Sequence, residues 1–191
     1  MRKFDIVIVG AGIVGLSIAW QLARRSSLKI AVLEKGAGVG EGSTGASSAV
    51  CRFRYSIDEV VHLARDGVAA YQNWKAFTGL TEPRAKFHQD GVLWMPGDNR
   101  SWADTEHARL QQLGIVTEVL DDADIEKRFP SLNTCTIAPD LEFGEPHDCE
   151  GGGRSLLEAE GGYVDPVSAA QDLVEACLNI GVVVEFKTHA T

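Results

Sequence analysis

Three glycines near the start of the chain have the spacing of a phosphate-binding turn. Gly10, Gly12 and Gly15 follow the pattern Gly-x-Gly-x-x-Gly, with Ile13 and Val14 before the last glycine. In such a turn the first glycine lets the chain leave a strand sharply, the second lets a pyrophosphate approach the backbone, and the third lets the next helix pack closely on the strand. The free N–H groups at the start of that helix favour an anion. The chemistry expected here is binding of a nucleotide diphosphate.

The flanking residues predict the elements that such a turn needs. Residues 5–9 are a β-branched run, typical of a parallel strand buried on both faces, and apolar residues then recur at helical spacing over 13–23. Residues 30–34 predict a second strand, so the whole forms a right-handed βαβ unit. Glu34 ends that strand, where its carboxylate can accept hydrogen bonds from ribose hydroxyls and would repel the 2′-phosphate of NADP. The predicted fold class is therefore α/β and Rossmann-like, and the alternative is a glycine turn in a nucleotide-free α/β domain.

A second glycine-rich segment follows Glu34. Residues 36–48 are rich in glycine and small hydroxyl residues, and they lead into Arg52 and Arg54. The backbone of this segment suits a second part of the ligand, whereas the plainer interpretation is a flexible linker. A guanidinium group binds a carboxylate through two parallel hydrogen bonds, so either arginine is a candidate for an acidic ligand group.

Taken together, these segments resemble the FAD-dependent amine and amino-acid oxidoreductases, which include D-amino-acid oxidase, glycine oxidase and monomeric sarcosine oxidase. The resemblance rests on residues 9–15, 33–35 and 42–55, and on two later segments, 124–130 and 161–167. It covers nearly the whole chain. The 42–45 and 161–166 segments are more specific to this group than the first motif, which many flavoproteins share.

The resemblance implies an enzyme that oxidises a C–N bond beside a carboxylate by hydride transfer to FAD. The implied substrate is a small molecule, either an amino acid or an amine, and Arg52 matches the arginine at the substrate carboxylate. Ala49 stands where the sarcosine oxidase pattern has another arginine, so the chemistry at the flavin face is not reproduced in full. The residues implied to bind FAD are Gly10, Gly12, Ile13, Val14, Gly15, Glu34, Lys35, Ser43, Thr44, Ser47 and Ser48.

The remaining patterns predict how the chain is organised. Residues 1–80 and 151–191 are expected to form an incomplete FAD-binding domain, and residues 81–150 part of a mixed α+β substrate domain. The elements expected are a helix over 58–77, a strand or hairpin over 87–95 turning at Asp90-Gly91, a helix over 102–113 and a strand over 116–120. Asp165 and Pro166 open a last helix, Gly181 ends it, and 182–186 return to the nucleotide sheet. Trp94 and Trp102 are expected to pack in the core, with a ligand contact as the alternative.

Composition excludes several classes of protein. The 191 residues carry a net charge of -9 and no Lys/Arg cluster, so no nucleic acid is expected as a partner. The four cysteines stand in no metal-binding or disulfide-scaffold spacing, which favours a reducing, cytoplasmic compartment. The uncharged run over 6–23 allows a membrane span or secretory signal, but its glycines argue against both. His147-Asp-Cys-Glu150 is weighed as a metal or nucleophile site and set aside, so no metal is expected.

The resemblance also implies that relatives continue for roughly as long again. Two hypotheses are therefore carried. The chain is the N-terminal portion of an FAD-dependent oxidoreductase that a complementary C-terminal segment or subunit completes, or it is a non-catalytic nucleotide-binding subunit or truncated product.

Overall fold

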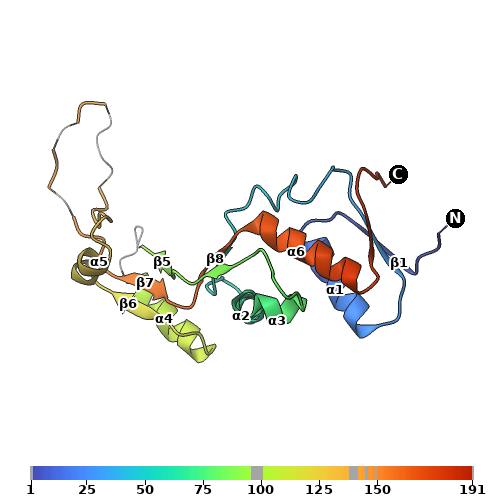
Figure 1. Cartoon of the computed structure of the whole chain (residues 1–191). Helices are drawn as coiled ribbons and strands as arrows, with labels where there is room; N and C mark the ends of the chain where they lie inside the picture. Colours follow the sequence, from blue (N-terminus) through green and yellow to red (C-terminus); the bar gives the residue numbers. More distant parts are fainter. Residues whose placement is uncertain (1, 96–100, 138–141, 145, 149, 191) are drawn as a thin grey trace. The chain divides into compact units, whose positions relative to one another are not determined.

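The structure is a computed structural model that describes residues 2–95, 101–137, 142–144, 146–148 and 150–190 (Figure 1). It divides into two compact units. Unit 1 comprises Met1–Cys51, Gly67–His88 and Tyr163–Thr191, and unit 2 comprises Arg52–Asp66 and Gln89–Gly162. Each unit is assembled from segments that are far apart in the sequence.

Unit 1 contains the predicted parallel sheet. Its strands are β1 (Ile6–Val9), β2 (Ile30–Leu33) and β9 (Val183–Glu185), in the order β1-β2-β9, and both pairings are parallel. Helix α1 (Ile13–Arg25) connects β1 to β2, and α6 (Pro166–Asn179) precedes β9 and packs against α1 (Figure 1). The βαβ unit, the third strand and the Rossmann-like α/β class are confirmed.

The first strand is less buried than its composition predicts. Ile8 faces α1, since its Cγ2 atom lies 3.4 Å from the position that a Gly15 Cβ would take. Val7 and Val9 point to the opposite face and are 51% and 68% exposed. Helices α1 and α6 contact each other and the strands of this sheet, and the exposure of Val7 and Val9 means that no described helix covers β1 on its other face. The prediction of burial on both faces is therefore wrong for β1, an edge strand, and holds for β2, where Ile30, Ala31 and Val32 are buried.

The last helix begins and ends as its residues predict. The Asp165 carboxylate accepts the Ser168 N–H at 2.6 Å, and Pro166 occupies the first turn, where its missing N–H costs nothing. Gly181 has φ +87°, a left-handed conformation that ends the helix before β9.

The helix expected over 58–77 is two helices, α2 (Asp58–Gln72) and α3 (Trp74–Thr78). Between them, the Ala69 carbonyl accepts both the Asn73 backbone N–H at 3.2 Å and the Asn73 side-chain amide at 3.0 Å, and Asn73 has the non-helical angles φ -115° and ψ 36°. The Trp74 indole N–H donates to the buried Asp172 carboxylate at 2.9 Å, which ties α3 to α6.

Two further sheets complete the fold. One has the order β3 (Val50–Cys51), β8 (Gly162–Val164), β4 (Phe87–His88), and the other is antiparallel with the order β5 (Val92–Trp94), β7 (Ser155–Glu158), β6 (Glu118–Leu120). Helices α4 (Trp102–Gln112) and α5 (Asp122–Arg128) pack on the second of these, around a core of Leu120, Ile125 and Leu157. The mixed α+β part of the fold is confirmed.

The hairpin considered for residues 87–95 is not formed. β4 pairs with β8, whereas β5 pairs with β7 in the other sheet. Gly91, at φ +82°, donates its N–H to the Gly161 carbonyl at 3.1 Å, so the turn carries the chain from one sheet to the next. Turn residues predict a change of direction, but the partner of each strand depends on residues some seventy positions away.

No helix in the described part of the chain has the length and hydropathy needed to span a bilayer. The uncharged run over 6–23 is a four-residue strand and part of α1, separated by the glycine turn.

Candidate functional site

The glycine motif opens a cleft in unit 1. The cleft has a volume of about 520 Å³ and lies where β1 and β2 end and α1 begins. Three of the residues assigned to FAD, Ile13, Ser47 and Ser48, do not line this cleft. The Ile13 N–H donates to the Thr44 hydroxyl, which does line it, and the Ser47 hydroxyl accepts the Ala49 N–H at 3.0 Å. The assigned residues that do line the cleft are Gly10, Gly12, Val14, Gly15, Glu34, Lys35, Ser43 and Thr44.

The local geometry explains why each of the three positions of the motif is a glycine. Gly10 has φ +103°, a conformation that a side chain disfavours. A Cβ on Gly15 would overlap the Gly10 carbonyl oxygen, so only glycine lets α1 approach β1 this closely. A Cβ on Gly12 would lie 2.9 Å from the Thr44 hydroxyl and would narrow the cleft.

The second glycine-rich segment is a packed turn with the same spacing as the first. Residues 40–45 also read Gly-x-Gly-x-x-Gly, Gly40 has φ +84°, and a Cβ on Gly45 would overlap the Gly40 carbonyl oxygen. The Thr44 hydroxyl accepts the Ile13 N–H at 3.1 Å and so caps α1, whose own N-cap residue, Gly12, has no side chain to do so. The repeated spacing, which is visible in the sequence, is the signal that could have identified this turn.

Glu34 holds the backbone on both sides of the cleft. One carboxylate oxygen accepts the Ala11 N–H and the other the Gly36 N–H, each at 2.8 Å. The Gly36 bond, then the Ala11 bond, and the neighbouring Lys35 charge hold the pKa of Glu34 below its ordinary value. The group is therefore ionised at neutral pH, and each oxygen keeps a second lone pair for a ribose hydroxyl.

The lining fits the ADP half of FAD. The amides of Val14 and Gly15 have no acceptor among the described residues, as expected of the first turn of a helix, and they suit phosphate oxygens. The glycines leave the backbone open to a close approach, and the Glu34 carboxylate has lone pairs that could accept hydrogen bonds from ribose hydroxyls. The exposed apolar side chains of Val9, Val14 and Ile18 add a surface for a flat aromatic group.

The two candidate arginines belong to unit 2, where they have different surroundings. The Arg52 guanidinium lies 4.7 Å from the ring centre of Tyr55 and 4.9 Å from that of Trp94. Arg54 lies 4.8 Å from Trp94 and 4.9 Å from Trp102, and its Nε is 3.2 Å from a Glu106 carboxylate oxygen. Both tryptophans therefore pack on arginine side chains. Within the described ranges no carboxylate forms an ion pair with Arg52.

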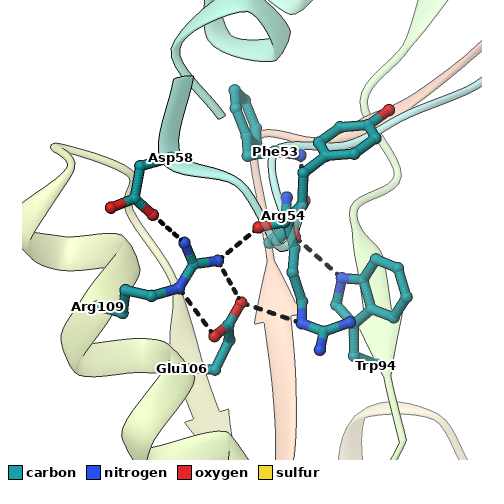
Figure 2. A network of polar contacts seen from close by, with 8 residues as sticks. Phe53, Arg54, Asp58, Trp94, Glu106 and Arg109 are labelled. Carbon is teal, nitrogen blue, oxygen red and sulfur yellow. Dashed lines mark hydrogen bonds and ion pairs between the residues drawn. The ribbon is translucent and has the colours of Figure 1, made fainter. Parts of the chain in front are cut away.

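Two carboxylates, those of Glu106 and Asp58, form ion pairs with Arg54 and Arg109 (Figure 2). Arg109 donates to Glu106 at 3.0 and 2.7 Å, to the Tyr55 carbonyl at 2.6 Å, and to Asp58. Arg109, and to a smaller degree Arg54, holds the pKa of Glu106 below its ordinary value. The charges of Arg54 and Arg109 are thus balanced locally, and Arg52 is the better candidate for an external anion.

One further residue shapes this site and was missed from the sequence. Glu158, at the end of β7, has no exposed surface. Its carboxylate accepts the N–H groups of Phe53 at 2.7 Å, Arg54 at 2.9 Å and the Trp94 indole at 2.9 Å. The available signal was an acidic residue at the end of the apolar run Ser-Leu-Leu-Glu.

His147, Asp148 and Glu150, the described residues of the 147–150 segment, are not among the residues that line the cleft of unit 1. The His147 Nε2 atom is 3.2 Å from the Cys135 sulfur, and Cys149 lies outside the described residues. Among the residues that the structure describes, no group of three or more His, Cys, Asp or Glu side chains is arranged to hold a metal ion.

Comparisons with known proteins agree with this architecture. A 145-residue stretch is 28% identical to FAD-dependent oxidoreductase domain-containing protein 1 of Xenopus laevis, covering 72% of this chain and 29% of that protein. The sarcosine oxidase subunit beta of Rhodobacter capsulatus is 24% identical, with 100% of this chain and 43% of that protein covered. This chain thus spans less than half the length of these relatives.

Solved structures share the fold. The L-proline dehydrogenase of P. horikoshii superposes with a TM-score of 0.79 at 21% identity, covering 100% of this chain and 46% of that one. The glycine oxidase of Geobacillus kaustophilus gives a TM-score of 0.74 at 19% identity, covering 99% and 48%. Residues 5–191 match the family model described as DAO, FAD dependent oxidoreductase, and the chain belongs to that family.

Proposed function

We propose that this protein acts in the oxidation of the C–N bond of an amino acid or secondary amine. Unit 1 binds FAD and unit 2 binds the substrate. The observation that carries the proposal is that one chain contains two sites. The first is the glycine-lined cleft with the ionised Glu34. The second is Arg52, whose guanidinium lies against the Tyr55 and Trp94 rings and has no ion-pair partner among the described residues.

The residues of unit 1 bind and orient the cofactor. The Val14 and Gly15 amides hold the pyrophosphate, and Glu34 accepts from the ribose. Thr44 keeps its hydroxyl proton free while its oxygen accepts the Ile13 amide, so it can donate to a phosphate oxygen. The remaining assigned contacts along the cofactor are Gly10, Gly12, Ile13, Lys35, Ser43, Ser47 and Ser48.

The residues of unit 2 select the substrate. Arg52 pairs with the substrate carboxylate through its planar fork, and the flanking Tyr55 and Trp94 rings fix the guanidinium plane and keep water from its faces. FAD, when bound, supplies the acceptor for the hydride that leaves the substrate carbon. Fixing the carboxylate restricts where the C–N bond lies, which is the positioning that hydride transfer requires.

The experiment is Arg52→Lys in the full protein, assayed with amino acids and with the corresponding amides. Lysine keeps the charge but loses the fork, so kcat/KM for the acids should fall roughly ten- to a hundred-fold relative to the amides. Arg65→Lys is the matched control, because the Arg65 side chain is 47% exposed and its one ion pair among the described residues is with its neighbour Asp66. An unchanged acid-to-amide ratio would remove Arg52 from the substrate site.

A second candidate is a subunit or truncated product that binds FAD or another nucleotide without catalysis. The observation in its favour is the share of the relatives that this chain spans, 43% or less of the two curated relatives described above. Flavin absorbance of the purified protein together with amine-dependent reduction of that flavin distinguishes the two: binding without reduction supports the second candidate.

The partner and compartment belong to the same proposal. Val7 on the edge strand β1 is exposed and lies outside the cleft lining, and it suits a complementary segment or subunit that covers this edge of the sheet. The thiols of Cys51 and Cys177 are buried and form no disulfide within the described residues, which suits a reducing, cytoplasmic compartment.

A further inference from the structure

The buried carboxylate of Glu158 is unusual because its charge has no cationic partner. The side chain has no exposed surface, and in the part of the chain that the structure describes it forms no ion pair. Three N–H groups satisfy it: one oxygen accepts from Phe53, and the other accepts from both Arg54 and the Trp94 indole. A carboxylate removed from water is stable only with such bonds, so it constrains the groups that supply them.

Those groups are the ones that determine where Arg52 lies. Two of them are the backbone amides of Phe53 and Arg54, which directly follow Arg52 in the chain, so Glu158 fixes the backbone next to the Arg52 Cα atom. The third is the indole N–H of Trp94, whose ring is one of the two surfaces on which the Arg52 guanidinium lies. In Figure 2 the Arg54 side chain lies against the Trp94 ring. One buried group therefore orients both the origin of the Arg52 side chain and a surface that holds its tip.

Glu158 is poorly suited to a direct role in proton transfer. Both of its oxygens already accept hydrogen bonds, and it is closed to solvent. The Arg54 side chain does not take the place of Glu158 in positioning Arg52, because the Arg54 guanidinium is itself held by an ion pair with Glu106.

We propose that Glu158 is a positioning residue for Arg52, holding the guanidinium fork in the orientation that receives a substrate carboxylate. The carboxylate part of this inference rests on the proposed function. The positioning part concerns only residues of unit 2 and is measured separately.

The first measurement reports position and uses no ligand. In the full protein, NMR signals of the Arg52 side chain, identified by their loss in Arg52→Lys, should be shifted upfield by the Trp94 and Tyr55 rings. Glu158→Gln keeps the shape but replaces one acceptor oxygen with a donor, so the shift should largely disappear. Glu126→Gln, on the exposed side of α5, is the matched control and should leave it unchanged.

The second measurement reports function, with acetate and acetamide as the probes. Glu158→Gln should lower the preference for acetate over acetamide about tenfold, the value of one hydrogen bond to a charged group, while FAD affinity stays the same. Trp94→Phe removes the indole N–H and keeps an aromatic ring, and it should reduce the same preference. That variant decides the matter if Glu158→Gln does not fold.

The outcomes distinguish the positioning role of Glu158 from the proposed substrate-binding role of Arg52. If the Arg52 shift and the acetate preference both survive Glu158→Gln, or the preference survives Trp94→Phe when Glu158→Gln does not fold, the inference is wrong. If the unmodified protein shows no acetate preference, the proposed role of Arg52 fails, and the ring-current shift still tests whether Glu158 positions it.

Discussion

The close approach of α1 to β1 depends on Gly15, and replacing it with alanine tests that dependence. The new Cβ would lie 3.3 Å from the Gly10 carbonyl carbon and would overlap the carbonyl oxygen, which is backbone and cannot rotate away. Helix propensity favours alanine by about 1 kcal/mol, but overpacking of a tight contact costs typically about 1–3 kcal/mol and displaces the helix whose amides face the cleft. Because the overlapped atom belongs to the backbone, the overpacking cost should be about 3 kcal/mol, and subtracting the propensity gain leaves a net loss of about 2 kcal/mol. We expect urea denaturation of Gly15→Ala to show this loss in the free energy of unfolding, together with weaker FAD binding.

Gly67→Ala is the matched control. Gly67 lies inside α2, and nothing is within 4 Å of its ideal Cβ, so the substitution keeps the propensity gain without the overlap. It should stabilise the protein by about 0.4–1 kcal/mol. The argument from close packing is refuted if Gly15→Ala unfolds at the same urea concentration as the unmodified protein, or if both alanines shift the midpoint in the same direction.

Three further predictions concern buried or partly buried carboxylates. Glu34→Ala should weaken FAD binding roughly ten- to a hundred-fold and Glu41→Ala much less, because only Glu34 ends β2; equal losses in a flavin titration would contradict the ribose assignment. The pKa of Glu34 is lower in the folded state, so its stabilising contribution is full above the ordinary value of 4.5 and is lost as pH falls through the folded value. Glu34→Gln should therefore flatten the fall in urea midpoint as the pH drops below the ordinary value of 4.5, and an unchanged slope there would argue against it. Asp172→Ala leaves the buried donors of Trp74 and Ala85 unpaired at about 1–3 kcal/mol each, so thermal unfolding should show a loss of about 2–6 kcal/mol, whereas a loss under 1 kcal/mol would mean that water replaces the carboxylate.

The nucleotide sheet was predictable because its signals are local. The run before Gly10, the glycine spacing and the acid that ends β2 are properties of contiguous residues, and they specify a βαβ unit directly. The cap at Asp165 and the stop at Gly181 are equally local. The exposure of Val7 and Val9 was not predictable in this way, because burial depends on which elements cover a strand and not on the strand's own composition.

Strand pairing in the other two sheets was harder to predict, since it depends on contacts between distant segments. The turn at Asp90-Gly91 has the residues of a hairpin, yet β5 pairs with β7, more than sixty residues later in the chain. The break at Asn73 is a similar case: the apolar spacing continues across it, and the side-chain bond to Ala69 that accompanies it leaves no trace in hydrophobic periodicity.

Arg52 and Arg54 show most clearly what the sequence leaves open at the site. They have the same side chain, stand two residues apart and both follow the second glycine segment, so residue type alone gives no reason to choose between them. The structure distinguishes them through residues that are remote in sequence. Glu106 pairs with Arg54, and Glu158 fixes the backbone and the indole around Arg52 while staying closed to solvent. Because a guanidinium already paired with a carboxylate gains less from a second anion, the external ligand is better assigned to Arg52. The choice depends on the position of Glu106, which pairs with Arg54 and not with Arg52, rather than on the arginines themselves.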